Sequence, residues 1–222
     1  MKKASLILSA VVAVTVMMLA SFGSSSSIEN ADSFKEVTIG TQTWMAKNLN
    51  VDKFRNGDSI PEVNTANEWQ KAANEGKPAW CYYHNDPKQG KRYGKYYNWY
   101  AVNDPRGLAP KGWHIPNIIE WEKLFNNLGG KDSAGKKMKS TSGWKYNGNG
   151  NNSSGFSGLP GGYRNDNGNL DVIGYSGDWW SSTYSGEDSL FALECGVNFR
   201  EDNTGIGLNS KGSGLSVRCV RD

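Results

Sequence analysis

The clearest pattern of hydrophobic and polar positions in the chain is helical. Between Asn117, the predicted N-cap, and Gly129-Gly130, the predicted end, apolar residues recur at the spacing of one helix face; these are Trp121, Leu124, Phe125 and Leu128. This face must pack against a sheet. A shorter helix is predicted over residues 66–74, because Thr65 and Glu68 have the spacing of a capping box.

Short alternating and aromatic-rich runs predict strands. Residues 34–45 are typical of a hairpin, with two alternating runs on either side of Gly40-Thr41. Further strands are predicted from aromatic and β-branched residues over 80–83, 96–102 and 215–221. After Trp144 the glycine-rich sequence predicts loops and short strands. We find no internal repeat and expect one domain over residues 34–222.

The N-terminal residues have the pattern of a secretory signal peptide. Lys2-Lys3 precede an apolar run over residues 4–20, and small residues follow it. This predicts a signal peptide of residues 1–23, with the neighbouring serines as alternative cleavage points. Residues 24–33 would then form a serine-rich tether. Phe22 stands where a lipoprotein needs its lipid-accepting cysteine, so we expect Sec-dependent export without lipidation, and membrane contact only before cleavage.

Charge gives no indication of a nucleic-acid partner, and composition favours a compact β protein. Removing residues 1–23 deletes two lysines and no acidic residue, which lowers the formal net charge from +3 to +1. The basic residues are scattered, and the cluster at residues 136–139 is typical of a solvated helix face. Nine Trp, ten Tyr and 27 Gly indicate a turn-rich β protein with an aromatic core.

Six ordered motifs give the chain a specific resemblance. They are Thr38–Leu49, Tyr93–Val102, Pro110–Pro116 with Glu120-Trp121, Gly155–Arg164, Trp179–Thr183 and Ser216–Asp222. Together they closely resemble the Fibrobacter succinogenes major paralogous domain, over roughly residues 34–222. That domain is similar to the C-type-lectin-like fold of formylglycine-generating-type proteins and of the variable receptors of diversity-generating retroelements.

The resemblance implies a fold and a general kind of function. The expected fold is an α+β, C-type-lectin-like domain with twisted antiparallel sheets, two to three short helices and long loops. The expected function is extracellular display and ligand binding, with no established chemistry. Trp113 and His114 are expected to belong to the structural frame, with His114 as a hydrogen-bonded core residue. A fixed corner is expected from a second group, which consists of Gly161, Gly162, Tyr163 and Arg164.

The chain has three cysteines, which allow at most one disulfide bond within it. The three are Cys81, Cys195 and Cys219. Many members of the resembled family have a cysteine where this chain has Ala109, so a bridge from that position to Cys219 is not possible. Our hypothesis is that Cys195 replaces it as the partner of Cys219, because Cys195 lies on a predicted strand near the C-terminal strand.

No constellation of catalytic or metal-binding residues is recognisable in the sequence. A phosphate-loop spacing over residues 130–136 is followed by Lys137 instead of the Ser or Thr that would ligate magnesium. The two histidines, His84 and His114, are too far apart for a local zinc pair. The motifs of calcium-dependent lectins do not occur. A calcium ion would therefore have to be bound by acidic loop residues such as Asp166, Asp171 and Asp202. We therefore expect neither catalysis nor a cofactor.

The leading functional hypothesis is a secreted or cell-surface binding module for carbohydrate or plant-fibre polymer. Trp179-Trp180 on a strand would point to opposite faces, which makes the outward tryptophan the best sugar-stacking candidate. The binding surface is expected in the loops between Trp179 and Lys211, because residues 184–211 contain none of the recognised motifs. The candidate ligand residues are Trp179, Trp180, Tyr184, Asn198, Arg200 and Asn203.

The sequence leaves two other functions open. The first is a structural or protein-interaction domain of the cell envelope, which an exposed apolar patch would favour. The second, more remote, is an oxidoreductase of the formylglycine-generating type, although the paired cysteines that this type uses for copper are not recognisable. The expected partner is thus an extracellular glycan or an envelope protein.

Overall fold

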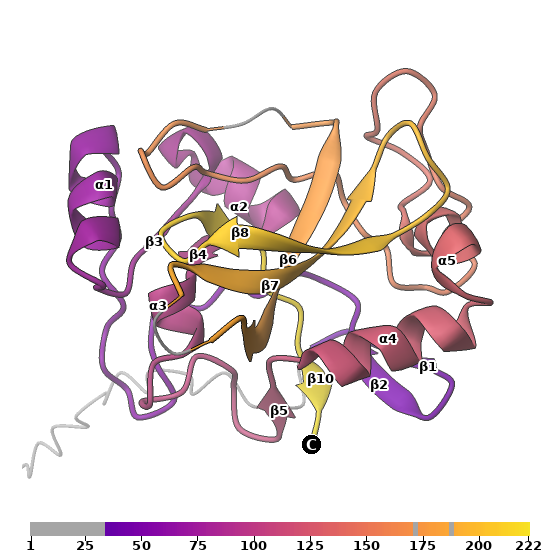
Figure 1. The fold of residues 1–222 in the computed structure, drawn as a ribbon, viewed down its shortest axis with the longest axis horizontal. Coiled ribbons are helices and arrows are strands. Elements are labelled where there is room, and N and C mark those ends of the chain that lie inside the picture. Colours follow the sequence, from indigo (N-terminus) through magenta and orange to yellow (C-terminus); the bar gives the residue numbers. More distant parts are fainter. Residues whose placement is uncertain (1–33, 171–172, 187–188) are drawn as a thin grey trace, which may run out of the picture. The chain divides into compact units, whose positions relative to one another are not determined.

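Three antiparallel sheets and five α-helices form the part of the chain that the structure describes (Figure 1). The structure is a computed structural model and describes residues 34–170, 173–186 and 189–222. The predicted signal peptide and tether lie outside the described residues. The expected α+β class is confirmed, although the helices outnumber the two to three expected. Within the described part, none of the helices has the length and apolar character needed to cross a membrane.

The N-terminal hairpin forms two of the four strands of the first sheet, which has the strand order β1-β2-β10-β5. β1 (Glu36–Ile39) and β2 (Gln42–Met45) form the predicted hairpin, and Gly40 in its turn has a φ of 61°. The last strand, β10 (Val220–Arg221), pairs with β2 on one side and with β5 (Trp113–His114) on the other. The first and last strands of the described chain therefore belong to one sheet.

The second sheet contains three very short strands. They are β3 (Trp80–Cys81), β4 (Tyr96–Asn98) and β9 (Gly214–Leu215), in that order. The strand predicted over residues 96–102 is wrong in its second half. Asn98 instead caps a helical turn, α3 (Trp99–Val102), and accepts a hydrogen bond from the third residue of that turn (3.1 Å). The strand predicted over residues 80–83 also ends early, where a 3₁₀ turn begins at Tyr83.

The predicted C-terminal strand over residues 215–221 is interrupted in its middle. Its ends belong to β9 and β10, but the carbonyl groups between them accept hydrogen bonds from two separate segments of the chain, residues 45–49 and Trp180; these carbonyls belong to Ser216, Val217 and Cys219. Arg218 is almost fully buried and donates to Asn48 Oδ1 (2.7 Å) and to two backbone carbonyls. A buried cation needs hydrogen-bond acceptors. The backbone around Arg218 is therefore placed where this side chain reaches its acceptors, and it does not continue one strand ladder.

The third sheet has the longest strands of the described chain. They are β6 (Ser176–Tyr184), β7 (Phe191–Asn198) and β8 (Gly205–Ser210), in that order. The expectation of loops and short strands after Trp144 is therefore wrong for residues 176–210. The sequence pattern of this sheet is weak because Gly196 and Gly207 occupy the middle of β7 and β8, where an alternating strand would have side chains.

The clearest predicted helix is confirmed as α4 (Ile118–Asn127). Asn117 and Glu120 form a complete capping box, in which each side chain accepts a hydrogen bond from the other residue's backbone N–H. Figure 1 shows α4 beside β1 and β2. Trp121 on the inner face of α4 contacts Trp44 of β2, with ring centroids 4.8 Å apart. The apolar stripe thus packs against the first sheet, as its spacing predicts.

The three remaining α-helices are α1, α2 and α5. α1 (Ala66–Asn74) has the predicted limits. α2 (Pro87–Tyr93) is not predicted, because only its N-cap, Asp86, marks it in a sequence with little apolar spacing. α5 (Lys131–Met138) contains part of the basic cluster. Lys139, directly after it, is only 1% exposed, so the expectation of a solvated face is wrong for this lysine.

The aromatic core lies on both faces of β6. One cluster contains Tyr97, Trp99, Trp113 and Trp180. The other contains Trp44, Trp121, Phe156 and Trp179. Successive residues of a strand point to opposite faces, so Trp179 and Trp180 anchor one cluster each, and β6 separates the two layers of the core.

Candidate functional site

The two tryptophans expected to offer a sugar-stacking surface are not exposed. Trp179 and Trp180 are both 0% exposed. Nε1 of Trp179 donates to Oδ1 of Asn48 (2.9 Å), and Nε1 of Trp180 donates to the Tyr97 carbonyl (2.7 Å). They point to opposite faces, as expected, but core residues cover each face. The prediction of an outward tryptophan is therefore wrong.

The other predicted ligand residues lie at opposite ends of the third sheet. The register of β6 and β7 places Tyr184 at one end and Asn198 at the other. Tyr184 is 41% exposed and packs edge-on against Trp99. Arg200 and Asn203 are exposed and follow Asn198 in the turn between β7 and β8. The predicted residues therefore do not form one site.

All three cysteines are free, buried thiols. Cys195 belongs to the core cluster of Trp179, and Cys219 belongs to that of Trp180. The predicted Cys195–Cys219 bridge is not formed, because the two thiols lie in different layers of the core. Burial raises the pKa of Cys81 to about 11 and that of Cys219 to about 12. It raises the pKa of Cys195 as well, so these thiols are poor nucleophiles at neutral pH.

His114 is partly exposed and lies between two carboxylates, whereas the sequence predicted a core position. Its Nε2 is 2.7 Å from Oε1 of Glu120, and its Nδ1 is 2.8 Å from Oδ1 of Asp222. Burial lowers the pKa of His114, but the two carboxylates outweigh this effect and raise it above its usual value. Glu120 also caps α4, so His114 connects the start of this helix with the C-terminal residue. Trp113 beside it is buried in the core.

The predicted corner is built around Arg164. This arginine is buried, and its guanidinium donates to three backbone carbonyls at 2.8 to 3.4 Å. It also lies over the ring of Trp69, 4.6 Å from the centroid. Gly162 has a φ of 64°, as a tight corner requires, whereas Gly161 has no positive φ. Tyr163 is partly buried against the core. The role of these residues is therefore structural.

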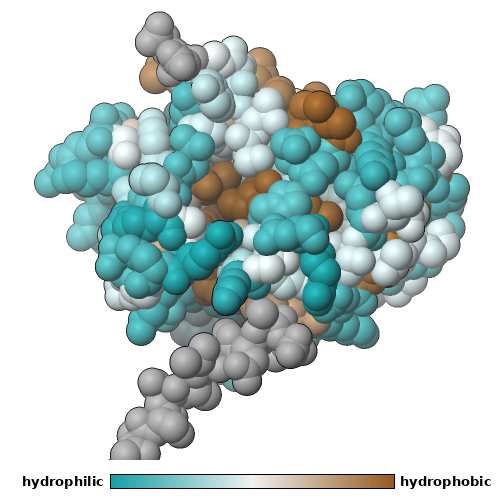
Figure 2. Space-filling model, turned by 90° about the horizontal axis from the view of Figure 1, so that it is seen from below, coloured by the Kyte–Doolittle hydropathy of each residue, from teal (hydrophilic) through white to brown (hydrophobic). Residues whose placement is uncertain are grey.

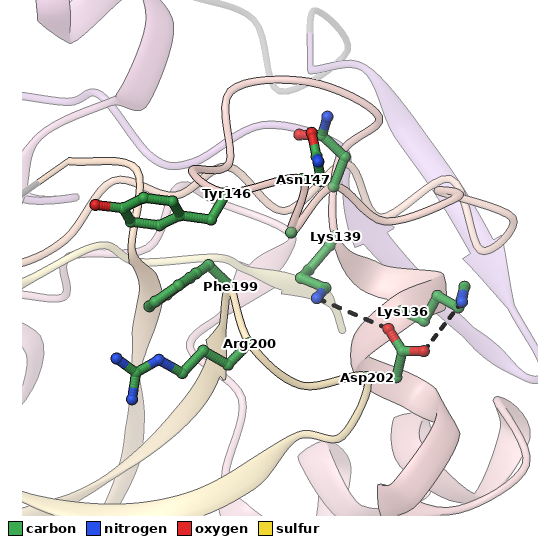
Figure 3. Close-up of a pocket in the computed structure, with 9 residues that line it drawn as sticks. Lys136, Lys139, Tyr146, Asn147, Phe199, Arg200 and Asp202 are labelled. Carbon is green, nitrogen blue, oxygen red and sulfur yellow. Dashed lines mark hydrogen bonds and ion pairs between the residues drawn. The ribbon is translucent and has the colours of Figure 1, made fainter.

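A surface cavity of about 370 Å³ lies where α5, a loop at residues 146–149 and the turn between β7 and β8 meet (Figure 3). Its volume is in the lower part of the range for small-molecule sites. Of the predicted ligand residues, only Arg200 lines it. The lining residues are Lys136, Lys139, Tyr146, Asn147, Gly148, Asn149, Phe199, Arg200 and Asp202.

One wall of the cavity is aromatic and exposed to solvent. Tyr146 is 76% exposed. Its ring centroid lies 5.5 Å from that of Phe199 and 6.0 Å from that of Tyr175. The guanidinium carbon of Arg200 lies 5.1 Å from the Phe199 ring centroid. In Figure 3, Tyr146, Phe199 and Arg200 follow one another along this wall. The Tyr146 ring and the Arg200 side chain are both exposed, on either side of Phe199.

The backbone holds Tyr146 outward in a strained conformation. Its φ is 48° and that of Asn147 is 61°. Asn tolerates this left-handed region, but a bulky aromatic residue rarely adopts it, at a cost of roughly 1–2 kcal/mol. Gly148 follows, and a side chain there would overlap the carbonyl oxygen of Phe199. Such strain persists where the surrounding structure enforces it, most often at functional sites, which directs attention to Tyr146.

The opposite wall of the cavity is charged. The ammonium group of Lys139 donates to the carbonyls of Asn198 (3.2 Å) and Glu201 (2.7 Å). Burial lowers the pKa of Lys139, against the attraction of Asp202. The Asp202 carboxylate lies 3.0 Å from Nζ of Lys136 and 4.0 Å from Nζ of Lys139, as the dashed lines in Figure 3 show. These contacts fix the turn that carries Phe199 and Arg200.

This arrangement suits binding better than covalent chemistry. It offers an aromatic ring for stacking, a guanidinium group, and the exposed side chains of Asn147 and Asn149. Among the described residues, no group of three or more His, Cys, Asp and Glu side chains is placed to hold a metal ion. Sequence reasoning missed Tyr146, although it precedes an Asn-Gly-Asn-Gly run that is typical of turns.

Comparison with known proteins places the chain in a family. The matching family is the Fibrobacter succinogenes major domain, and the match spans residues 37–221. It therefore includes every residue that lines the cavity and all six motifs except their last residue, Asp222. No curated protein and no solved structure matches the chain. The chain belongs to the Fibrobacter succinogenes major domain family.

Proposed function

We propose that this domain is a binding module, exported to the cell surface or beyond, that binds carbohydrate at the cavity beside Tyr146. The observation that carries the proposal is the exposed Tyr146 ring, held in a strained backbone conformation next to Phe199 and Arg200. Aromatic rings present flat apolar faces to ligands, and the C–H face of a sugar ring matches such a surface. The neighbouring amide and guanidinium groups are suited to sugar hydroxyls. Export rests on the N-terminal sequence pattern, and a C-type-lectin-like scaffold remains part of the proposal.

The proposal is of binding without catalysis. Among the residues that line the cavity, Asp202 is the one carboxylate, and two lysines hold it. A general base needs to reach the proton that it abstracts, and Asp202 is already engaged. An oxidoreductase of the formylglycine-generating type is not favoured, because that chemistry uses reactive cysteines. The three thiols here are buried and have raised pKa values.

The first test is a binding assay with the mature chain, residues 24–222. The protein is incubated with insoluble cellulose, xylan and pectin, with and without calcium, and the bound fraction is measured over a range of protein concentrations. We expect saturable binding to at least one polymer. We also expect calcium to have no effect, because Asp202 is paired with lysines. Absence of binding to every glycan would contradict the proposal.

Two tyrosine variants locate the site. Tyr146→Ala removes the exposed ring of the cavity, whereas Tyr184→Ala removes an exposed ring at the other end of the third sheet. Loss of one stacking ring should weaken binding by about tenfold or more for Tyr146→Ala. Tyr184→Ala should bind like the unmodified protein. Equal losses in both variants, or a loss only for Tyr184→Ala, would place the site elsewhere.

A protein-interaction role is the second candidate, and it rests on exposed apolar side chains. Leu190, Phe191 and Leu208 lie at the start of β7 and on β8, with exposed fractions of 72%, 48% and 58%. β8 is an edge strand of its sheet, and edge strands are able to pair with other chains. On the face seen in Figure 2, however, apolar surface occurs in separate areas between hydrophilic side chains. We therefore rank this role second.

A further inference from the structure

We infer that the cavity beside Tyr146 is selective for acidic sugars, that is, for a polysaccharide whose units carry a carboxylate. The inference rests on the proposed carbohydrate-binding function and adds the chemical class of the ligand. Its basis is an imbalance of charge among the lining residues. Lys136, Lys139 and Arg200 are basic, and Asp202 alone is acidic.

Lys136, Lys139 and Asp202 already have interaction partners within the fold. Asp202 accepts from Lys136 Nζ at 3.0 Å, and Lys139 Nζ donates to two backbone carbonyls. The backbone N–H of Lys136 also donates to the carbonyl of Asp202 (2.8 Å). These groups are therefore committed to holding the β7–β8 turn against α5. The net positive charge that remains for a ligand is centred on Arg200.

Arg200 is exposed and has no carboxylate or carbonyl partner for its guanidinium among the described residues. Its guanidinium makes a cation–π contact with the Phe199 ring, at 5.1 Å from the centroid. The nearest acidic neighbour in the sequence, Glu201, accepts a hydrogen bond from Asn203 instead (2.6 Å). Oδ1 of Asn198 accepts from the backbone N–H of Arg200 (2.8 Å) and holds the backbone that carries this side chain. The planar fork of N–H donors lies over the Phe199 ring and is open to solvent.

A guanidinium fork matches a carboxylate in geometry and charge, with two parallel hydrogen bonds. Tyr146 and Arg200 lie on either side of Phe199 along one wall (Figure 3). A sugar ring stacked on Tyr146 would bring a ring substituent toward this wall, where a carboxylate meets Arg200. A neutral sugar would offer the guanidinium only hydroxyl acceptors, without an opposite charge or a two-fold hydrogen-bonded pair. The wall therefore combines sugar and carboxylate recognition in one place.

The test compares two polymers that share a backbone and differ in charge, with a neutral polymer of another sugar beside them. Binding of the mature chain is measured to polygalacturonate, to the same polymer with its carboxyl groups methyl-esterified, and to cellulose. We expect binding to polygalacturonate to be tighter by about tenfold or more, the effect of one charge-assisted hydrogen-bonded pair. We also expect this advantage to weaken with added salt. A sulfated dextran serves as a control for charge without a sugar carboxylate.

Two arginine variants make the test specific. Arg200→Gln should reduce binding to polygalacturonate to the level of the esterified polymer, and Arg200→Lys should restore only part of the preference, since it lacks the fork. Arg92→Gln is the matched control, because Arg92 is also an exposed arginine over an aromatic ring, that of Tyr93 (5.2 Å). It should bind like the unmodified protein.

The outcomes separate the inference from the proposed function. Equal binding to the charged and esterified polymers, or to sulfated dextran and polygalacturonate, would overturn the acidic-sugar inference and leave the carbohydrate-binding function standing. Equal losses in Arg200→Gln and Arg92→Gln would overturn the inference in the same way. Absence of binding to all the sugar polymers would overturn both.

Discussion

Two clusters of this protein are built from the same kinds of residue and have opposite environments. In the core, Arg218 lies over Phe156 at 4.3 Å, beside Trp179. At the cavity, Arg200 lies over Phe199 at 5.1 Å, beside Tyr146. The first arginine is 1% exposed and the second is exposed to solvent.

The difference lies in the acceptors around each guanidinium. Arg218 donates to Asn48 Oδ1 and to two backbone carbonyls, so its donors are satisfied within the fold. Burial nevertheless lowers its pKa to about 9, which shows how strongly the core disfavours its charge. Arg200 has no such acceptors among the described residues. The comparison teaches that the core cluster is complete by itself, whereas the cavity cluster has capacity left for a ligand.

The largest expected contrast comes from removing one aromatic ring from each cluster. Trp179→Ala should lower the free energy of unfolding by about 3–5 kcal/mol, because it leaves a large cavity within one layer of the core. Tyr146→Ala should change it by less than about 1 kcal/mol, because the ring is exposed. Urea unfolding followed by tryptophan fluorescence measures both values. A strongly destabilised Tyr146→Ala variant would show that the exposed ring is structural.

The acceptor of the buried arginine gives the next effect. Asn48→Ala removes the side-chain oxygen that accepts from both Arg218 and Trp179. It should lower the free energy of unfolding by about 3 kcal/mol, because a buried cation loses its best acceptor. In an Arg218→Met background, the same substitution should cost clearly less. Equal costs in the two backgrounds would mean that Asn48 does not act through Arg218.

Relieving the strain at Tyr146 should have a smaller and opposite effect. Tyr146→Gly allows the φ of 48° without steric cost and should raise the free energy of unfolding by about 1 kcal/mol. The same variant should lose glycan binding. Thermal unfolding and the polymer assay are measured on one preparation. Gly at the neighbouring exposed position, Lys145→Gly, provides the control, and a gain in stability there of the same size would argue against strain at Tyr146.

The smallest expected effect is a pH dependence at His114. Its pKa is raised in the folded state, so its contribution to stability is present below its unfolded pKa of about 6.5 and is lost as pH rises through the folded pKa. His114→Gln should therefore be destabilised relative to the unmodified protein at about pH 5.5 and much less so at about pH 9. Melting temperatures at the two pH values test this. A deficit that does not change with pH would show that the ion pairs with Glu120 and Asp222 contribute nothing.

The local signals in the sequence were enough for part of the fold. Asn117 and Glu120 form the capping box that their spacing predicts, and Gly40 turns the first hairpin. These features depend on residues a few positions apart, so the sequence contains all the atoms involved. The third sheet was under-predicted, since its strands depend on pairing between segments whose own apolar pattern glycines interrupt.

The sequence by itself determined the α+β class, the family motifs, the caps and turns, and the pairing of Trp179 and Trp180 with opposite faces of one strand. Only the tertiary structure decided which aromatic residues meet solvent. Exposure depends on what the rest of the chain places over a residue, and both tryptophans are covered while Tyr146 is not. The cavity joins residues 136–149 with the turn at residues 199–202, which is about fifty residues further along the chain. A local sequence pattern does not predict that these segments come together, because the contacts between them form only when the layers of the core pack.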